Sequence, residues 1–392
     1  MHCMVVKMIR FFIYFILLCL FIISCKQNKD KTGNPILVNT NQTSNYDLFD
    51  FVDSVRFIKL QTTNDNLIGS INKVFFDDNQ IIVVDSKVKQ IFVFDAEGNY
   101  SHNINKRGQG SGEYVSMSVV RYDYQKKCIF VYDASTYKML IYSIDGNLTQ
   151  EILDFSHKAV IVDFFNLQNG NFLCYYFLNT TKQVGDRSGL WETDSLGNRI
   201  RSFFGYETLY PTTINYDNSY FNLLSDNKVA FRDAITNDVY HFENGVLNKY
   251  ISFRIRNYNP KSLAGDIYTE QRFTTSLSSQ EKGNYIFTQW RGPDYRYYTV
   301  YSKSNPEQSM PISKNDNFWS VYNNVFPIHN KFVDSNNCNA LLIAISGESI
   351  LEFLKNDKTS PDMKANFNQL INGMSEDEIL YMNPILQLLY IK

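Results

Sequence analysis

Two arginines and three aromatic residues gather in one short stretch of the chain, from Gln289 to Tyr297. Tryptophan, tyrosine and arginine anchor many protein interfaces, and flat aromatic faces also stack on sugar rings. We expect these side chains to lie on a turn rather than within a strand, where a ligand can reach them. Packing inside the fold is the alternative, above all for Tyr297. The candidate binding residues of this stretch are Trp290, Arg291, Tyr295 and Arg296.

A second stretch, residues 107–114, places three glycines at alternate positions. Because glycine tolerates positive φ, successive amide N–H groups could turn toward an anion, with Arg107 adding positive charge. In the alternative interpretation the glycines let the chain cross tightly between two structural units, while Glu113 accepts hydrogen bonds from the backbone. A phosphate-binding P-loop is excluded because its Lys-Ser/Thr pair is missing and no helix pattern follows. The candidate residues here are Arg107, Gly108, Gly110, Gly112, Glu113 and Tyr114.

No other motif specifies catalysis or a cofactor. We expect neither a metal site nor a cofactor, because the histidines of the folded part lie far apart, without cysteine or carboxylate at zinc-ligand spacing. Nucleophile-elbow, zinc-protease and EF-hand motifs are also missing. Paired carboxylates from distant segments could still form a glycosidase site, whereas the alternative treats the many turn carboxylates as solvated caps. The histidines concerned are His102, His157, His241 and His329.

The N-terminus carries a targeting pattern. Lys7 and Arg10 precede fourteen mostly apolar residues, 11–24, and Cys25 follows directly. Such cations, a short apolar run and a small residue before the cut are typical of a signal peptide, and residues 22–25 resemble a bacterial lipobox. We therefore predict a lipid on Cys25 that holds the mature chain on a membrane. An uncleaved anchor is the alternative, but the run is shorter than the roughly 20 apolar residues that cross a bilayer.

Composition indicates one large folded body behind this anchor. The chain has 392 residues, 15% of them aromatic, and a formal net charge of only −2, so no general attraction to nucleic acid is expected. The segment after Cys25 is polar without periodicity and predicts a flexible tether. The predicted organisation is a signal peptide over residues 1–24, a lipidated tether over 25–45 and a folded domain over 46–392.

Three cysteines fall in the predicted folded domain. In an oxidising compartment any two of them could form a disulfide, and the sequence leaves the pairing open. Two of the three lie inside apolar, strand-like runs, which favours buried free thiols. These residues are Cys128, Cys174 and Cys338.

A repeat of about 48 residues predicts the fold. The apolar run Ile81–Asp85 aligns with Ile129–Asp133 at an offset of 48 residues, and glycine turns continue the series less regularly. A period of roughly 40 to 50 residues, with short strands between turns, is typical of a β-propeller, in which each four-stranded blade must stack on its neighbours. The turns are Gly98-Asn99, Gly146-Asn147, Gly197-Asn198 and Gly245-Val246.

The two ends of the domain should close the ring. Val55–Leu60 and Pro384–Ile391 are both unpaired, strand-like runs, and we predict that they share one blade. A further blade is expected around Asn284–Met310, after a long connection over residues 257–283. Short helices are predicted near the C-terminus, over residues 346–354 and 362–374 and in a turn capped at 375–378.

Several longer segments also occur in a known family, and in the same order along the chain. They are Val55–Thr63 with Leu67–Gly69, Arg107–Tyr114, Asp238–Tyr240 and Asn383–Leu386. Together they resemble the six-bladed β-propeller lipoproteins of the Bacteroidetes, which are related in shape to NHL-repeat propellers. The resemblance implies an all-β fold of six four-stranded antiparallel blades, and it implies little about function. Ser111 stands where this family usually has proline, which predicts a less rigid loop.

Three classes of function remain open. The favoured one is a non-catalytic binding or scaffold lipoprotein, whose propeller holds a glycan, a peptide or an envelope protein. The second is a polysaccharide lyase or hydrolase with its residues at the propeller mouth, and the third is a sensor or assembly part without a small ligand. The chain lacks, after Cys25, the acidic cluster that resembles a surface-export signal in such bacteria. We therefore expect an outer-membrane lipoprotein on the periplasmic face.

Overall fold

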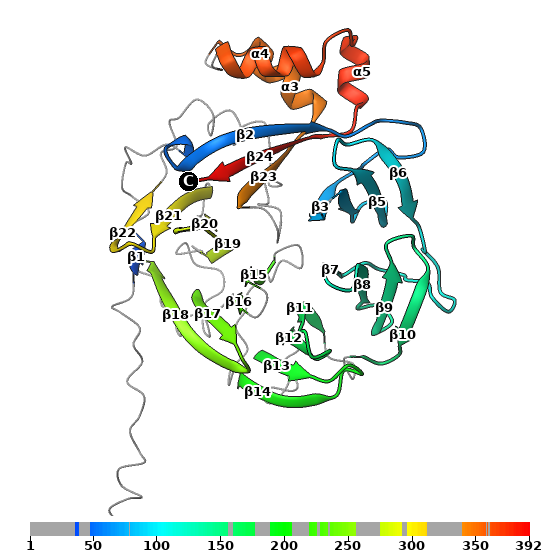
Figure 1. Cartoon of the computed structure of the whole chain (residues 1–392), viewed down its shortest axis with the longest axis vertical. Coiled ribbons are helices and arrows are strands. Elements are labelled where there is room, and N and C mark those ends of the chain that lie inside the picture. Colours follow the sequence, from blue (N-terminus) through cyan, green and yellow to red (C-terminus); the bar gives the residue numbers. More distant parts are fainter. Residues whose placement is uncertain are drawn as a thin grey trace, which may run out of the picture.

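The chain folds into a ring of six β-sheets, the blades, around a central axis (Figure 1). This arrangement confirms the predicted six-bladed propeller. The computed structural model describes residues 36–38, 48–77, 79–155, 160–176, 189–205, 219–225, 228–233, 236–255, 275–291, 296–311, 339–357, 359 and 361–392.

Blades 1 to 3 each contain four antiparallel strands in sequence order, with the first strand nearest the axis. Blade 1 comprises β3 (Ile71–Asp77), β4 (Gln80–Asp85), β5 (Gln90–Asp95) and β6 (Tyr100–Ile104). Blade 2 comprises β7 (Val119–Asp123), β8 (Cys128–Asp133), β9 (Lys138–Ser143) and β10 (Leu148–Ile152). Blade 3 comprises β11 (Ile161–Asn166), β12 (Phe172–Tyr176), β13 (Gly189–Thr193) and β14 (Arg199–Gly205).

Blades 4 and 5 continue this pattern. Blade 4 comprises β15 (Phe221–Ser225), β16 (Lys228–Arg232), β17 (Asp238–Glu243) and β18 (Val246–Ile255). Blade 5 comprises β19 (Thr275–Lys282), β20 (Tyr285–Arg291), β21 (Arg296–Ser302) and β22 (Asn305–Pro311). The predicted connection over residues 257–283 is therefore wrong in part, because its last residues form β19.

Blade 6 closes the ring as predicted. β2 (Val52–Lys59), which follows the short 3-10 turn η1 (Leu48–Phe51), pairs antiparallel with β24 (Ile385–Ile391). β24 in turn pairs with β23 (Ala340–Ile345), so blade 6 has three strands among the described residues. The two ends of the domain are thereby held together by backbone hydrogen bonds.

Part of the segment that was predicted to be a flexible tether forms a strand. β1 (Ile36–Val38) lies within residues 25–45 and pairs in parallel with the outer strand β18, with Ile36 opposite Phe253. It also lies next to β22, so the chain before the domain joins the ring between blades 4 and 5 (Figure 1).

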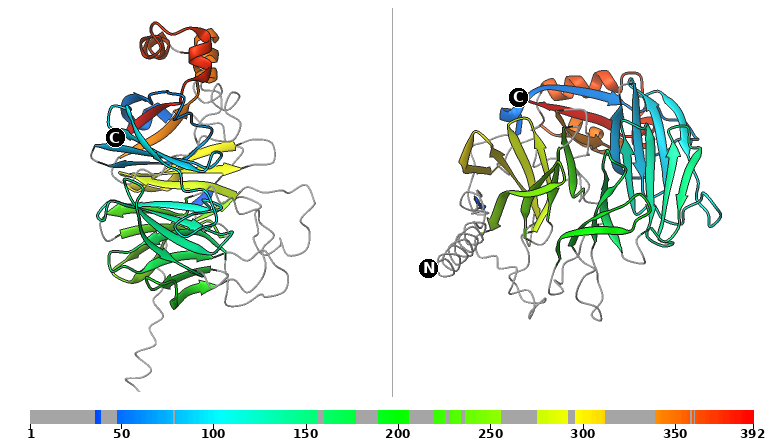
Figure 2. Two further views of the ribbon diagram at one scale, coloured as in Figure 1. Left: turned by 90° about the vertical axis from the view of Figure 1, so that its right-hand side faces the viewer. Right: turned by 60° about the horizontal axis from the view of Figure 1, so that its bottom comes forward.

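Three short helices connect β23 to β24 and stand outside the ring (Figures 1 and 2). They are α3 (Gly347–Lys355), α4 (Pro361–Leu370) and α5 (Glu376–Tyr381), and they confirm the predicted helices. Ser375 and Glu378 form a capping box at the start of α5, as their spacing indicates. Within the described part of the chain, no helix has the length and apolar character needed to cross a membrane.

The repeated aspartate has a structural cause. Asp85 and Asp133 end the second strands of blades 1 and 2, and both are fully buried. Asp133 accepts hydrogen bonds from the amides of Val115 and Ser116 in the incoming connection and from Ser135 in its own turn, at 2.8, 3.2 and 2.9 Å. Each aspartate thus ties an incoming connection to its blade. These carboxylates are not the solvated caps that one interpretation of the sequence expected.

Apolar clusters fill the spaces between neighbouring blades. Val83 and Phe92 of blade 1, for example, pack in one cluster with Leu342 and Leu388 of blade 6. Because both faces of a blade are covered in this way, its inner strands are almost continuously apolar, as β4 illustrates. Strands alternate in direction, so the turns between first and second strands and between third and fourth strands share one end of the ring, here called the hairpin face.

Candidate functional site

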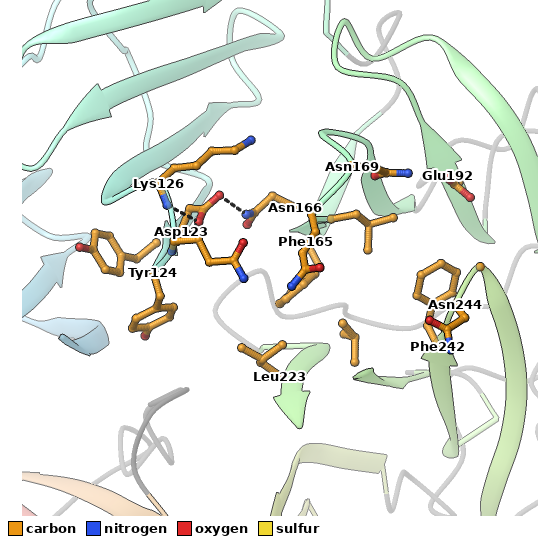
Figure 3. Close-up of a pocket in the computed structure, with 16 residues that line it drawn as sticks. Asp123, Tyr124, Lys126, Phe165, Asn166, Asn169, Glu192, Leu223, Phe242 and Asn244 are labelled. Atoms are coloured by element: carbon orange, nitrogen blue, oxygen red, sulfur yellow. Dashed lines mark hydrogen bonds between the residues drawn. The ribbon is translucent and has the colours of Figure 1, made fainter. Parts of the chain in front are cut away.

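A pocket of about 350 Å³ opens on the hairpin face, at the small end of the range typical of ligand sites (Figure 3). Its walls come from the β7–β8 turn of blade 2, the β11–β12 turn of blade 3 and the β17–β18 turn of blade 4. The pocket therefore exists only because three blades are held side by side.

Asp123 fixes the wall formed by blade 2 and links it to blade 3. Its Oδ1 accepts hydrogen bonds from the amides of Gln125 and Lys126, each at 2.9 Å. Its Oδ2 accepts a hydrogen bond from Asn166 Nδ2 at 2.8 Å. The first two bonds close the turn, as aspartate commonly does after a strand. The third joins two blades at the pocket rim.

Glu192 of β13 is held in a similar way at the wall formed by blade 3. Its Oε1 accepts a hydrogen bond from Asn171 Nδ2 at 2.8 Å, and its Oε2 accepts one from Arg201 Nε at 2.7 Å. Both oxygens therefore have a donor inside the protein. This carboxylate shapes the wall and is not placed as a free acid or base.

Aromatic rings form the apolar part of the pocket. Tyr122 and Phe242 are buried, whereas Tyr124 and Phe165 are half-buried. Tyr122 donates a hydrogen bond to Asp77 Oδ2 at 2.8 Å. Burial first, and then this contact, raise the pKa of Tyr122 far above its ordinary value, so its hydroxyl stays neutral.

The described lining of the pocket consists mainly of neutral polar groups and apolar side chains. Among the described residues around the pocket there is no histidine or cysteine, and both carboxylates are engaged by internal donors. The lining also includes the exposed ammonium group of Lys126. Its rings and carboxamides suit a polar ligand with an apolar face.

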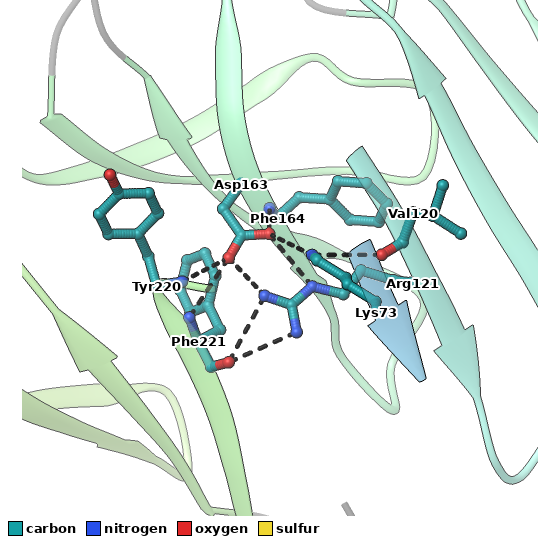
Figure 4. A network of polar contacts seen from close by, with 7 residues as sticks. All are labelled: Lys73, Val120, Arg121, Asp163, Phe164, Tyr220 and Phe221. Atoms are coloured by element: carbon teal, nitrogen blue, oxygen red, sulfur yellow. Dashed lines mark hydrogen bonds and ion pairs between the residues drawn. The ribbon is translucent and has the colours of Figure 1, made fainter. Parts of the chain in front are cut away.

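A second polar cluster, at the axis, is sealed (Figure 4). Asp163 of β11 accepts hydrogen bonds from Arg121 Nε at 3.1 Å, from Arg121 Nη2 and from the amide of Tyr220 at 2.7 Å. Lys73 Nζ of β3 lies 3.9 Å from Asp163 Oδ1, and Arg121 also donates to the carbonyl of Phe221 at 3.4 Å. Asp163 is 0% and Arg121 3% exposed.

This axial cluster joins strands of blades 1, 2, 3 and 4. An active site at the propeller mouth would need arginine, histidine, tyrosine and carboxylate side chains that face the substrate. Here Arg121 and Asp163 meet, but Tyr220 contributes its backbone amide, and the charged groups are closed to solvent. The cluster acts as an internal brace between blades.

In the glycine loop, residues 107–114, the protein itself occupies the amides that an anion would need. Glu113 Oε2 accepts a hydrogen bond from Gly110 N at 2.8 Å, and Glu151 Oε2 accepts one from Gly112 N at 3.0 Å. Of the three glycines only Gly112 has positive φ, at +69°. Ser111 Oγ donates a hydrogen bond to Glu151 Oε2 at 2.6 Å. The serine therefore holds the loop in place, although a serine instead of proline predicted a less rigid loop.

The ends of this loop are fastened as well. Tyr114 is fully buried, and its hydroxyl donates to the carbonyl of Lys89 at 3.0 Å. Burial raises the pKa of Tyr114 to about 12. Gly108 N donates to the carbonyl of Tyr114 at 3.0 Å, and Arg107 forms a parallel bridge with the same residue. These contacts agree with the crossing role that the alternative interpretation gave the loop.

The aromatic and arginine-rich stretch forms the end of a hairpin. Trp290 and Arg291 close β20 and Arg296 opens β21, with Arg291 opposite Arg296. The expectation that these residues lie outside strands is therefore wrong for all three, because strand pairing continues to the end of the hairpin. Tyr295 lies outside the described residues.

The structure describes only two of the predicted cysteines. Cys25 and Cys338 lie outside the described residues, whereas Cys128 and Cys174 are buried free thiols, as predicted. Burial raises the pKa of Cys128 to about 11 and that of Cys174 to about 12. The described part of the chain contains no group of three or more histidine, cysteine or carboxylate side chains close enough to hold a metal ion.

Sequence reasoning missed both the pocket and the axial cluster. The pocket residues Asp123, Asn166 and Asn244 stand on ordinary polar turns, which carry no distinguishing signal. The axial residues did leave a signal, since Arg121 and Asp163 each interrupt an otherwise apolar innermost strand. A charge in such a place requires a partner, but the sequence does not say which one.

One solved structure of similar length supports the fold. A crystal structure of a Bacteroides fragilis protein described as exported has a TM-score of 0.73 and 18% identity, and the match covers 92% of this chain and all of that one. A member of the DUF4221 family from Bacteroides vulgatus has a TM-score of 0.45 and 8% identity, over 66% of this chain and 84% of that one. Similarity at 18% identity supports the fold alone. None of the curated proteins compared with this chain matches it.

One family covers nearly the whole chain. Residues 33–390 match DUF4934, described as a domain of unknown function. The match begins just before β1 and ends within β24, so it contains the complete ring of blades. The chain therefore belongs to the DUF4934 family.

Proposed function

We propose that this protein is a non-catalytic binding module, and that its ligand occupies the pocket between blades 2, 3 and 4. The ligand class at this level is a glycan, a peptide or a segment of an envelope protein. The observation that carries the proposal is the pocket itself, in which rings and carboxamides surround a preformed hollow while both carboxylates are engaged internally. Apolar rings with a few placed polar groups are the usual lining of a ligand site.

The proposal includes attachment to the bacterial envelope through Cys25. The support is the targeting pattern of residues 1–25, together with the position of β1. Ten residues separate Cys25 from Ile36, which at full extension reach about 35 Å. A lipid at Cys25 would hold the edge of blades 4 and 5 near the membrane. Labelling cells with an alkyne fatty acid tests this part, since Cys25→Ala should abolish incorporation into the chain.

Ligand binding is tested by thermal unfolding of the full chain in a detergent without sugar headgroups. A ligand at a hundred times its Kd adds about 2.7 kcal/mol, which raises Tm by a few degrees. Gln168→Trp places a large ring at the exposed rim and should abolish the shift. Gln150→Trp, the same change on the exposed outer strand of blade 2, should preserve it. Equal shifts in the two variants would place the ligand elsewhere.

A further inference from the structure

We propose that the pocket between blades 2, 3 and 4 selects a neutral saccharide, which lies against the rings of Tyr124 and Phe165 while the rim carboxamides bind its hydroxyls. This inference rests on the proposed binding function and specifies the ligand class of the same site. It combines three independent properties of the lining: its charge, its hydrogen-bonding groups and its rings.

The charge of the lining disfavours an anionic ligand. The described residues that form it include two carboxylates, Asp123 and Glu192, and one ammonium, Lys126, and the ion pair of Glu192 with Arg201 compensates the second carboxylate. Sites for phosphate or carboxylate gather arginines or several backbone amides. Here the amides of Gln125 and Lys126 already donate to Asp123, and the guanidinium of Arg201 already donates to Glu192. A neutral ligand needs no such cations or amides.

The rim suits hydroxyl groups. Four carboxamides lie exposed around the opening, on the turns of all three blades. A carboxamide both donates and accepts hydrogen bonds, as a sugar hydroxyl does, whereas an ionised side chain does only one of the two. Carboxamides on turns of three blades can therefore form hydrogen bonds with hydroxyls on different edges of one sugar ring. The four residues are Gln125, Gln168, Asn169 and Asn244.

The rings are positioned in advance. Tyr124 makes an edge-to-face contact with Tyr122, with ring centroids 4.9 Å apart and planes at 84°. The ring centroid of Phe165 lies 6.3 Å from that of Phe221, on the innermost strand of blade 4. Side chains held in this way lose little freedom when a ligand arrives, which strengthens binding. The axial C–H groups of a sugar ring are apolar and pack on an aromatic face.

The walls argue against an extended peptide. Peptides in extended form usually add a strand to the open edge of a sheet, where backbone hydrogen bonds supply much of the affinity. The outer strands of blades 2 and 3 are β10 and β14, and neither contributes a residue to the described lining of this pocket. The pocket is lined mainly by turns and strand ends, which do not present a row of free backbone groups to which a peptide strand could pair.

The test measures binding by isothermal titration with the full chain in a detergent that carries no sugar. The probes are neutral hexasaccharides of glucose, mannose, galactose, xylose and N-acetylglucosamine, an acidic hexagalacturonate and an uncharged hexapeptide. We expect one or more neutral probes to bind. Phe165→Ala should weaken that binding about tenfold, and Phe165→Tyr, which keeps the ring, should change it less than threefold. Lys126→Gln should leave it within twofold, because the ligand carries no charge.

Controls separate the ligand class from the binding function. Tyr381 is 77% exposed on α5, so Tyr381→Ala removes an aromatic ring outside the pocket lining and should not affect binding. Circular dichroism of each variant tests whether it is folded. Gln168→Ala changes an exposed rim residue, so it should weaken binding without affecting the core. If hexagalacturonate or the peptide binds in a Phe165-dependent way while neutral probes do not, the inference fails and the binding function stands. Binding of no probe, or binding that Gln168→Trp leaves unchanged, overturns both.

Discussion

The axial cluster and the interblade pocket are both polar, and both form where several blades meet, yet they are built differently. Asp163 at the axis is surrounded by two cations and by backbone amides from another blade, with no exposed surface. Asp123 at the pocket receives only neutral donors, and the groups around it include exposed carboxamides and half-buried rings. The difference indicates that the axial cluster stabilises the ring, whereas the pocket keeps exposed polar groups at its rim.

Neutralising each carboxylate tests the difference between the axial cluster and the pocket most directly. Asp163→Asn leaves Arg121 and Lys73 buried beside a neutral amide and should lower the free energy of unfolding by about 4 kcal/mol. Asp123→Asn loses hydrogen bonds from neutral donors only and should cost about 1.5 kcal/mol. Urea unfolding followed by circular dichroism measures both. Equal losses would remove the distinction between a braced axis and an open pocket.

Two glycines extend the comparison to the turns. Gly197 and Gly170 both have positive φ, at +89° and +85°. A Cβ at Gly197 would overlap the carbonyl oxygen of Phe155, whereas a Cβ at Gly170 would meet no atom within 4 Å. Gly197→Ala should therefore cost about 3 kcal/mol, from strain plus overlap, and Gly170→Ala only about 1 kcal/mol, from strain. Thermal unfolding compares the two, and a Gly170→Ala variant as unstable as Gly197→Ala would contradict this reasoning.

A pH titration examines the contact between blades 4 and 5. Burial tends to raise the pKa of Glu281, but hydrogen bonds from His241 at 3.0 Å and Lys303 at 2.6 Å outweigh it, so the pKa is lowered. A carboxylate with a lowered folded-state pKa stabilises the fold above its unfolded pKa of about 4.3, and this stability disappears as pH falls through the folded value.

Glu281→Gln should accordingly be about 1 kcal/mol less stable than the wild type at neutral pH. The difference should shrink as pH falls from about 5 to about 3, because the wild-type carboxylate then takes up a proton. Urea unfolding at a series of pH values measures the difference. A gap of the same size at every pH would show that the charge of Glu281 does not contribute.

The smallest effect concerns the pocket rim. Lys126 is exposed, and its backbone amide, which a side-chain change leaves in place, donates to Asp123. Lys126→Gln should change the free energy of unfolding by less than about 0.5 kcal/mol. The same urea titration detects any larger loss, which would make the rim part of the stabilising structure.

Much of the fold was predictable because its signals are local. The glycine turns at Gly98, Gly146 and Gly197 follow third strands and all require positive φ. In the turn after β5, Asp95 Oδ1 accepts hydrogen bonds from the amides of Glu97 at 3.0 Å and Asn99 at 2.8 Å. Together with the turn at Gly245, the spacing of these turns therefore marked blades 1 to 4.

The hairpin of Trp290 and Arg296 was misjudged, because a Gly-Pro turn with large side chains on both sides suits either an exposed loop or the end of a strand pair. The pocket was beyond prediction for a different reason. Asp123 and Asn166 lie 43 positions apart, and Phe165 contacts Phe221 across 56 positions. Nothing in either turn specifies its neighbour on the next blade.

Local residue patterns were sufficient to specify the strands, the turns and the repeat, since these depend on side chains a few positions apart and on the conformations that glycine and aspartate permit. The sequence also determined that the two terminal strands had to find each other, because each was left without a partner. Which polar groups are buried at the axis and which form an open pocket depends instead on how the blades pack together. Ring closure sets the distances between blades, and those distances bring Arg121 to Asp163 and place three turns around one hollow.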